Sequence, residues 1–168
     1  NSNTQWIIAS ETVALLAAGV TRFHEVLPGE LLTINSSKPK KTHFAAKTTP
    51  SALCIFENVY LLNEHTKAHV PSTTATALRR NRTVNQVRFR SGQILATEAP
   101  LSATTVDYVI GIPGTGIAGG QGYANKLKLP YVQAIIDQAT PESEKRTFMS
   151  ANIGDIGTEA LSHFTIDP

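Results

Sequence analysis

The 168-residue chain has very little of several residue types that would otherwise define its class. It has one cysteine, Cys54, which excludes an internal disulfide and any all-cysteine metal site made by one chain. No apolar run approaches the roughly 20 residues that a membrane-spanning helix needs, and Asn1 opens no signal-peptide pattern. We therefore expect a soluble, cytoplasmic protein with no membrane partner, and the single cysteine fits a reducing compartment.

The chain has a small net charge, but its positively charged residues are concentrated in one tract. The net charge is only +2, yet residues 38–90 hold ten of the fifteen Lys and Arg residues and only two acids, Glu57 and Glu64. A basic tract suits nucleic acid or a polyphosphate, but aromatic side chains are hardly interleaved with the cations, and Phe89 alone lies within the run 88–90. A solvated loop and helix face explains the tract better, so we expect no nucleic-acid partner.

The chain does have enough apolar residues, 41%, for one compact domain or parts of two. Its most informative stretch is 106–124, VDYVIGIPGTGIAGGQGYA, where a β-branched apolar run precedes a proline, several glycines and an apolar helix start. This order is typical of the strand, loop and helix of an α/β nucleotide-binding unit. A second apolar run at 130–136 completes a βαβ crossover, so we expect parallel strands at 106–112 and 131–136 and a helix starting near Ile117.

The glycine-rich loop admits two interpretations. Gly114, Gly116 and Gly119 satisfy the G-x-G-x-x-G pattern of dinucleotide-binding folds, and Asp137 closes the next strand where a ribose-binding acid would lie. The alternative is a polyphosphate loop, in which glycines allow close backbone approach, the helix N-terminus offers N–H groups and Thr115 adds a hydroxyl. The bare glycine pattern gives weak support, and the rest of the chain favours the polyphosphate interpretation.

The remaining elements are predicted from periodicity and turn residues. They are a helix over 11–20 with Ser10 as N-cap and Gly19 as its stop, two short strands over 23–34 around Pro28-Gly29, a polar linker or long hairpin loop over 35–50, a buried strand or short helix over 51–62, a mobile loop over 63–81 and a helix from Val84 to Ala99. His65 and His69 are four residues apart, but no third ligand follows at motif spacing. We therefore expect surface histidines.

Seven segments follow one another in the order and roughly the spacing of one protein family. They are IIASETVAL, EVLPGE, ALCIFENVY, RFRSGQILATEAP, VDYVIGIPGTGIAGGQGYA, LPY and RTFM, and the resemblance covers most of the chain over residues 6–149. In these segments the chain resembles the glutamine phosphoribosylpyrophosphate amidotransferases, or amidophosphoribosyltransferases. The resemblance implies an α/β fold: residues 1–50 would be a small α+β remnant of an N-terminal-nucleophile glutaminase domain with a linker, and 51–168 a partial phosphoribosyltransferase-like domain with a short parallel sheet and flanking helices.

The resemblance also implies a chemistry, in which ammonia from glutamine displaces pyrophosphate from phosphoribosyl pyrophosphate (PRPP) to give phosphoribosylamine for purine synthesis. It assigns phosphate binding to Gly114, Thr115 and Gly116, places Thr115 beside a Mg²⁺ ion, and leaves Lys145 and Arg146 as compensating cations. Some members hold an iron–sulfur cluster through a cysteine aligned with Cys54. Without partner cysteines, we expect no cluster here and a buried Cys54.

The departures from the family are as informative as the matches. The chain opens with Asn1 and not with the family's nucleophilic cysteine, and everything upstream of the family's ASE segment is missing. Residues 137–140 replace a basic PRPP clamp, and the family's PRPP signature has no match, since Asp155 is better explained as a helix N-cap. We therefore predict a fragment or reduced relative that is inactive as this chain alone, with no catalytic residue assigned. The alternative is a non-catalytic phosphate-, nucleotide- or partner-binding module. Self-association into a homo-oligomer is left open.

Overall fold

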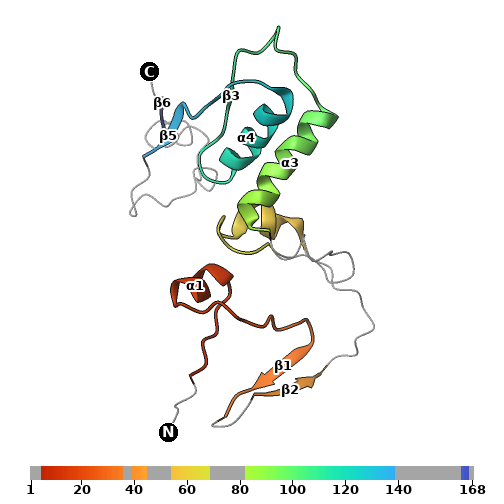
Figure 1. The fold of residues 1–168 in the computed structure, drawn as a ribbon, viewed down its shortest axis with the longest axis vertical. Coiled ribbons are helices and arrows are strands. Elements are labelled where there is room, and N and C mark those ends of the chain that lie inside the picture. Colours follow the sequence, from red (N-terminus) through yellow and green to blue (C-terminus); the bar gives the residue numbers. More distant parts are fainter. Residues whose placement is uncertain (1–4, 36–38, 45–53, 69–81, 139–163, 167–168) are drawn as a thin grey trace, which may run out of the picture. The chain divides into compact units, whose positions relative to one another are not determined.

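The computed structural model describes residues 5–35, 39–44, 54–68, 82–138 and 164–166. The elements in chain order are α1 (Thr12–Ala17), β1 (Glu30–Thr33), β2 (Lys40–His43), η1 (Glu57–Leu61), α3 (Val84–Glu98), β3 (Val109–Ile110), α4 (Gly116–Leu127), β4 (Tyr131–Val132), β5 (Ile135–Asp137) and β6 (Phe164–Ile166) (Figure 1). They form two compact units, Asn1–Val84 and Asn85–Pro168. Within the described ranges, no helix has both the length and the apolar character needed to cross a bilayer.

In the first unit, helix α1 ends as predicted but begins differently. Gly19 has a φ of +77° and donates its N–H to Leu16 O at 2.9 Å, while the Val20 N–H reaches Leu15 O at 2.9 Å. These two bonds form a Schellman motif, which explains why glycine stops the helix. The prediction of Ser10 as N-cap was wrong, because Glu11 occupies that position.

The Glu11 side chain joins α1 to a distant segment instead of capping the helix. Its carboxylate accepts the backbone N–H of Asn63 at 2.9 Å and the hydroxyl of Thr66 at 2.7 Å. Beside it, the Thr12 hydroxyl accepts the N–H of Lys67 at 2.8 Å. The start of α1 is therefore fixed by polar contacts that are 52 to 55 residues apart in sequence.

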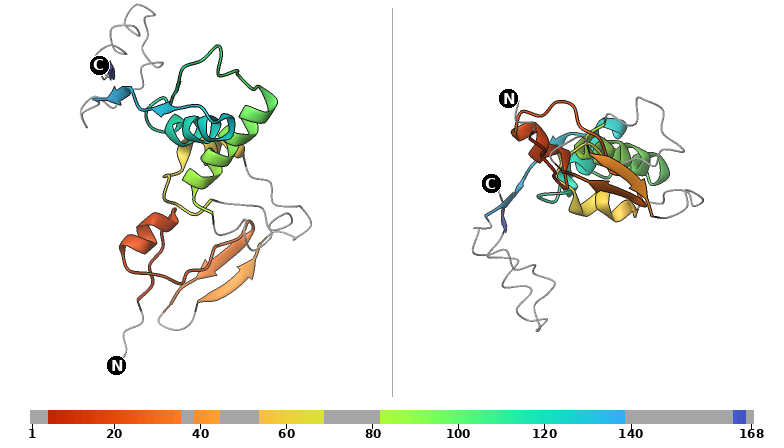
Figure 2. Two further views of the ribbon diagram at one scale, coloured as in Figure 1. Left: turned by 45° about the horizontal axis from the view of Figure 1, so that its top comes forward. Right: turned by 90° about the horizontal axis from the view of Figure 1, so that it is seen from below.

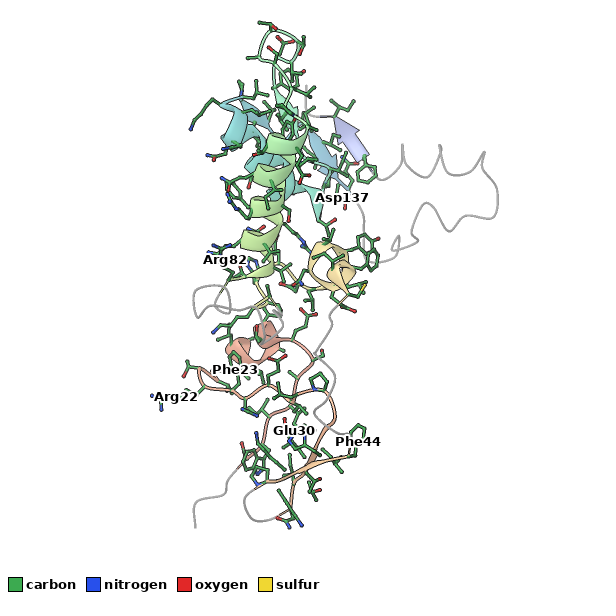
Figure 3. The ribbon with its side chains drawn as sticks, turned by 90° about the vertical axis from the view of Figure 1, so that its right-hand side faces the viewer. Arg22, Phe23, Glu30, Phe44, Arg82 and Asp137 are labelled. Carbon is green, nitrogen blue, oxygen red and sulfur yellow. The ribbon has the colours of Figure 1, made fainter. Side chains whose placement is uncertain are left out.

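The β-hairpin of the first unit corrects two predictions. Residues 23–27 form no strand, and β1 pairs antiparallel with β2, which lies in the tract predicted as a linker. The buried Glu30 explains this pairing, since its carboxylate accepts the Leu27 N–H at 2.9 Å and lies 3.1 Å from Lys41 Nζ. Glu30 and Phe44 lie at the same end of the hairpin (Figure 3), where the Phe44 N–H donates to Gly29 O at 3.1 Å.

The stretch 51–62, predicted as a buried strand or a short helix, contains a short helix. Element η1 is a π-helix, closed by the Leu62 N–H donating to Glu57 O at 2.9 Å. Cys54 is exposed, so the prediction of a buried cysteine was wrong; it lies ahead of the first helical turn.

Residues 63–68 bear on two predictions, the surface position of His65 and the mobile loop. His65 is exposed, with Nε2 3.4 Å from Glu64 Oε1, as expected of a surface histidine. Residues 63–68 are ordered by turns and by a bridge between Lys67 and Thr83 rather than forming part of a mobile loop. His69 and the remainder of the predicted loop lie outside the described residues.

In the second unit, the predicted helices at Val84 and near Ile117 are both present, and α3 and α4 lie side by side (Figure 2). Glycine permits this contact: a Cβ on Gly92 would lie 1.9 Å from Gly119 O, and one on Gly122 would lie 1.9 Å from Phe89 O. Real Cβ atoms do not approach backbone so closely, so the crossing requires glycine at both positions. The Tyr123 hydroxyl adds a 2.7 Å bond to Ala99 O.

The predicted parallel pairing is confirmed, although the strands are shorter than expected. β3 pairs parallel with β4, with Val109 opposite Tyr131. The second predicted strand is divided into β4 and β5. Gln133 lies between them, and its side chain donates to Gly111 O, just after β3, at 3.0 Å and to Ile135 O, at the start of β5, at 2.9 Å. β5 continues antiparallel to β6. The result is an α/β unit with a short parallel sheet and flanking helices, as predicted.

Candidate phosphate-binding loop

The β3–α4 loop (residues 111–115) connects the parallel sheet to the N-terminus of α4. Gly114 has a φ of +80° and open space around it, a conformation that side chains rarely adopt. Thr115 is the N-cap of α4, a helix of 12 residues, and its hydroxyl makes no capping bond to the helix. The first N–H groups of a helix have no partner within it and add a partial positive charge. No acidic residue in the first turn opposes that charge.

The start of the loop is pressed against its surroundings. A Cβ on Gly111 would lie 2.5 Å from the Tyr131 hydroxyl and 2.9 Å from Ile117 Cα. A Cβ on Gly120 would lie 3.1 Å from Gly111 Cα and 3.2 Å from the Tyr131 ring. Two glycines thus create the slot that the Tyr131 ring fills, which brings β3, α4 and β4 together at the base of the loop.

Tyr131 and Gln133 form a hydrogen-bonded group beside this slot. The Tyr131 hydroxyl donates to Gln133 Oε1. Burial raises the pKa of Tyr131 above its usual 10.0, while a hydrogen bond from the Gly111 backbone acts in the opposite direction. The hydroxyl therefore keeps its proton at neutral pH and remains a donor. Sequence reasoning missed this pair, although positions i and i+2 share one face of a strand and would have suggested it.

The structure brings together three of the five predicted phosphate-binding residues. Gly114, Thr115 and Gly116 are consecutive at the loop and helix start. Lys145 and Arg146 lie outside the described residues, so their assignment stays a prediction. Asp137 is the exposed last residue of β5.

The donor set of the loop bears on Mg²⁺. This ion prefers oxygen ligands and usually binds through one or two carboxylates together with substrate phosphates. Residues 111–116 offer the Thr115 hydroxyl and backbone carbonyls but no carboxylate, and elsewhere in the described ranges no three His, Cys, Asp or Glu residues gather as metal ligands. The loop therefore suits a Mg²⁺ ion that arrives with a polyphosphate better than one held by the protein alone.

The sequence is similar to those of known proteins. The chain is 38% identical over 134 residues to an amidophosphoribosyltransferase of Mycobacterium bovis, covering 80% of this chain and 22% of the relative. The chain is therefore related to the amidophosphoribosyltransferases. It spans about a fifth of the length of the curated relatives it matches. No model of a known protein family matches the chain.

Two solved structures share the fold as well as the sequence likeness. The glutamine PRPP amidotransferase of B. subtilis, complexed with ADP and GMP, superposes with a TM-score of 0.69 at 25% identity, covering 94% of this chain and 30% of that one. A structure described as the allosteric regulatory enzyme of purine biosynthesis gives a TM-score of 0.66 at 28% identity, covering 86% and 27%. The α/β fold predicted from the sequence is confirmed by both.

Proposed function

We propose that the β3–α4 loop binds the pyrophosphate group of PRPP, or a similar polyphosphate, together with Mg²⁺, and that this chain by itself does not make phosphoribosylamine. The observation that supports the binding site is the conformation at the start of α4: Gly114 has a positive φ, the Thr115 hydroxyl makes no capping bond, and the first N–H groups of the helix have no partner within it. When bound, Mg²⁺ would neutralise charge on the departing pyrophosphate.

The proposed lack of turnover follows from the groups around the loop. The family resemblance aligns the exposed Asp137 with a cation of the PRPP clamp, and an acid in that role would weaken pyrophosphate binding. Each missing charge-assisted contact costs a few kcal/mol of transition-state stabilisation, so several together lower the rate beyond detection.

A dinucleotide site is the second candidate, and helix packing argues against it. In dinucleotide folds the third glycine of the G-x-G-x-x-G pattern lets the helix approach the strand. Here Gly119 faces α3, where its carbonyl opposes Gly92, and the contact with the strand side is made by Gly120. The sequence therefore matches the pattern, but the helix contacts the strand through Gly120, one residue after the glycine that makes this contact in dinucleotide folds.

Two titrations separate the candidates. PRPP or pyrophosphate with Mg²⁺ should bind more tightly than NAD, and Thr115→Ala should weaken the phosphate ligand and leave NAD unchanged. Thr104→Ala, in an exposed turn of the same unit, is the matched control. Tighter binding of NAD would overturn the proposal.

Turnover needs its own assay. With ammonia, PRPP and Mg²⁺ in excess, we expect pyrophosphate release at the background rate. Release above background that Thr115→Ala abolishes would show that the chain holds a complete site.

A further inference from the structure

We infer that Gln133 is a positioning residue for the phosphate-binding loop, with Tyr131 fixing the orientation of its amide. That Gln133 holds the loop follows from hydrogen-bond geometry. That this affects ligand binding rests on the proposed function. Gln133 lies two residues after the start of β4, and its side chain is part-buried. It reaches across to Gly111, the first residue of the β3–α4 loop.

Each polar atom of the Gln133 amide has a partner that defines its orientation. Its Nε2 lies 3.0 Å from Gly111 O and 2.9 Å from Ile135 O. Both partners are carbonyls, which only accept, so the NH₂ group must face them. The amide oxygen then faces the Tyr131 hydroxyl, which donates to it. One side chain thus ties the carbonyl that begins the loop to the strand that follows β4.

The rest of the loop start has no freedom to compensate if this tie is lost. Gly111 is enclosed by the Tyr131 hydroxyl, Ile117 and Gly120, so its peptide can turn only by moving the carbonyl that Gln133 holds. Gly114, three residues later, lies in open space at a positive φ. The loop is fixed at Gly111 and can bend at Gly114. The bond from Gln133 to Gly111 therefore sets where Thr115 and the α4 N-terminus lie. Such preorganisation improves affinity by lowering the ordering cost of binding.

The substitution Gln133→Glu tests this inference because it keeps the size and the oxygen that Tyr131 bonds. A carboxylate cannot donate, so it would face Gly111 O and Ile135 O as a third acceptor. At pH 7.5 we expect hydrogen exchange of the Gly111 amide, which bonds the Tyr131 hydroxyl, to quicken about tenfold and the Kd for Mg²⁺-pyrophosphate to rise about tenfold, while α3 amides stay unchanged. Gln121→Glu, an exposed residue of α4 that lies outside both the loop and residues 137–140, is the matched control.

Acid provides a rescue that a general packing defect would not show. Protonation of the carboxylate introduced by Gln133→Glu restores one donor, so the ratio of variant to wild-type Kd should fall between pH 7.5 and pH 5. Tyr131→Phe keeps the ring in its glycine slot and removes only the hydroxyl, so its effect should have the same sign and be smaller. If Gln133→Glu leaves loop exchange and Kd unchanged, or if acid does not lower the ratio, Gln133 does not position the loop.

The two readouts keep this inference apart from the proposed function. Failure of the wild-type chain to bind Mg²⁺-pyrophosphate would contradict the proposed function. Hydrogen exchange in the ligand-free protein would still decide whether Gln133 holds the loop.

Discussion

In the unit Asn1–Val84, carboxylates and hydroxyls join segments that are distant in sequence, whereas in Asn85–Pro168 glycines let backbones touch. Glu11 binds Asn63 and Thr66, and Glu30 binds Lys41 across the hairpin. In the second unit, by contrast, Gly92 and Gly122 bring α3 and α4 into backbone contact. Water can replace a polar side-chain contact, but it cannot replace a close-packed one. The candidate loop lies in the unit with the stiffer kind of contact.

The largest expected effect comes from breaking the helix crossing. Gly122→Ala should lower the free energy of unfolding by about 3 kcal/mol, the upper part of the range for overpacked sites, because its Cβ would lie 1.9 Å from Phe89 O. Chemical denaturation monitored by circular dichroism measures this. Gly119→Ala is the control in the same helix, since its Cβ has only Arg88 O at 3.9 Å nearby. It should be neutral or stabilising, and equal losses for both variants would contradict the account of the crossing.

The next effect is smaller and should be the same in both units. Gly19 and Gly114 have φ values of +77° and +80°, and neither has an atom within 4 Å of a built Cβ. Gly19→Ala and Gly114→Ala should therefore each cost about 1 kcal/mol through backbone strain alone. Only Gly114→Ala should also weaken binding of Mg²⁺-pyrophosphate. A loss of ligand affinity in Gly19→Ala would argue against a local effect at the loop.

The hairpin of the first unit should respond to acid, and the loop should not. A hydrogen bond from the Leu27 N–H, followed by one from Lys41, holds the pKa of Glu30 below its usual 4.5. A lowered pKa contributes stability that is present above pH 4.5 and lost as the pH falls through the value in the folded protein. NMR shifts of β1 and β2 should show this acid transition, and Glu30→Gln should remove it.

The control for the acid transition is a surface carboxylate in the same unit. Glu64 pairs with the exposed His65 at 3.4 Å and with no other residue that the structure describes, so Glu64→Gln should leave the transition unchanged. An acid transition that persists in Glu30→Gln would assign it to another group.

The smallest expected effect is a gain. Lys128 follows α4 with a φ of 61°, a left-handed conformation that costs an L side chain energy and that Gly19 adopts without strain after α1. Lys128→Gly should stabilise the second unit by up to about 1 kcal/mol, measured by the same denaturation. Lys126→Gly, inside the helix, should instead destabilise it, because glycine is a poor helix former. A loss in both variants would show that the left-handed cap is not strained.

The sequence predicted best where a segment's own residues determine its structure. Helices α3 and α4, the glycine stop at Gly19 and the parallel pairing of β3 with β4 follow from periodicity and turn chemistry. The misses depend on partners that are distant in sequence. β2 is a Lys-rich strand recruited by the buried Glu30, and Glu11 takes the cap position while its side chain binds residue 63. The second predicted strand is divided where the Gln133 side chain bonds Gly111.

The candidate site was predicted in part for the same reason. Gly114, Thr115 and Gly116 are contiguous in sequence, so the motif itself placed them. Tyr131 and Gln133 belong to the following strand, and their contact with Gly111 depends on how β3 and β4 pair. The slot for the Tyr131 ring requires Gly111 and Gly120, whose importance appears only when the atoms around them are known.

The most direct test of the central claim is a residue-by-residue NMR titration of the backbone amides with pyrophosphate, with and without Mg²⁺. We predict that the largest saturable shifts fall on the amides of Gly114, Thr115 and Gly116, grow when Mg²⁺ is present, and are lost in Thr115→Ala. The hairpin amides of β1 and β2 should not move. The assignment of the β3–α4 loop as a phosphate-binding site would be contradicted if the largest shifts fell elsewhere in the chain, or if the resonances of these three amides did not shift at saturating pyrophosphate.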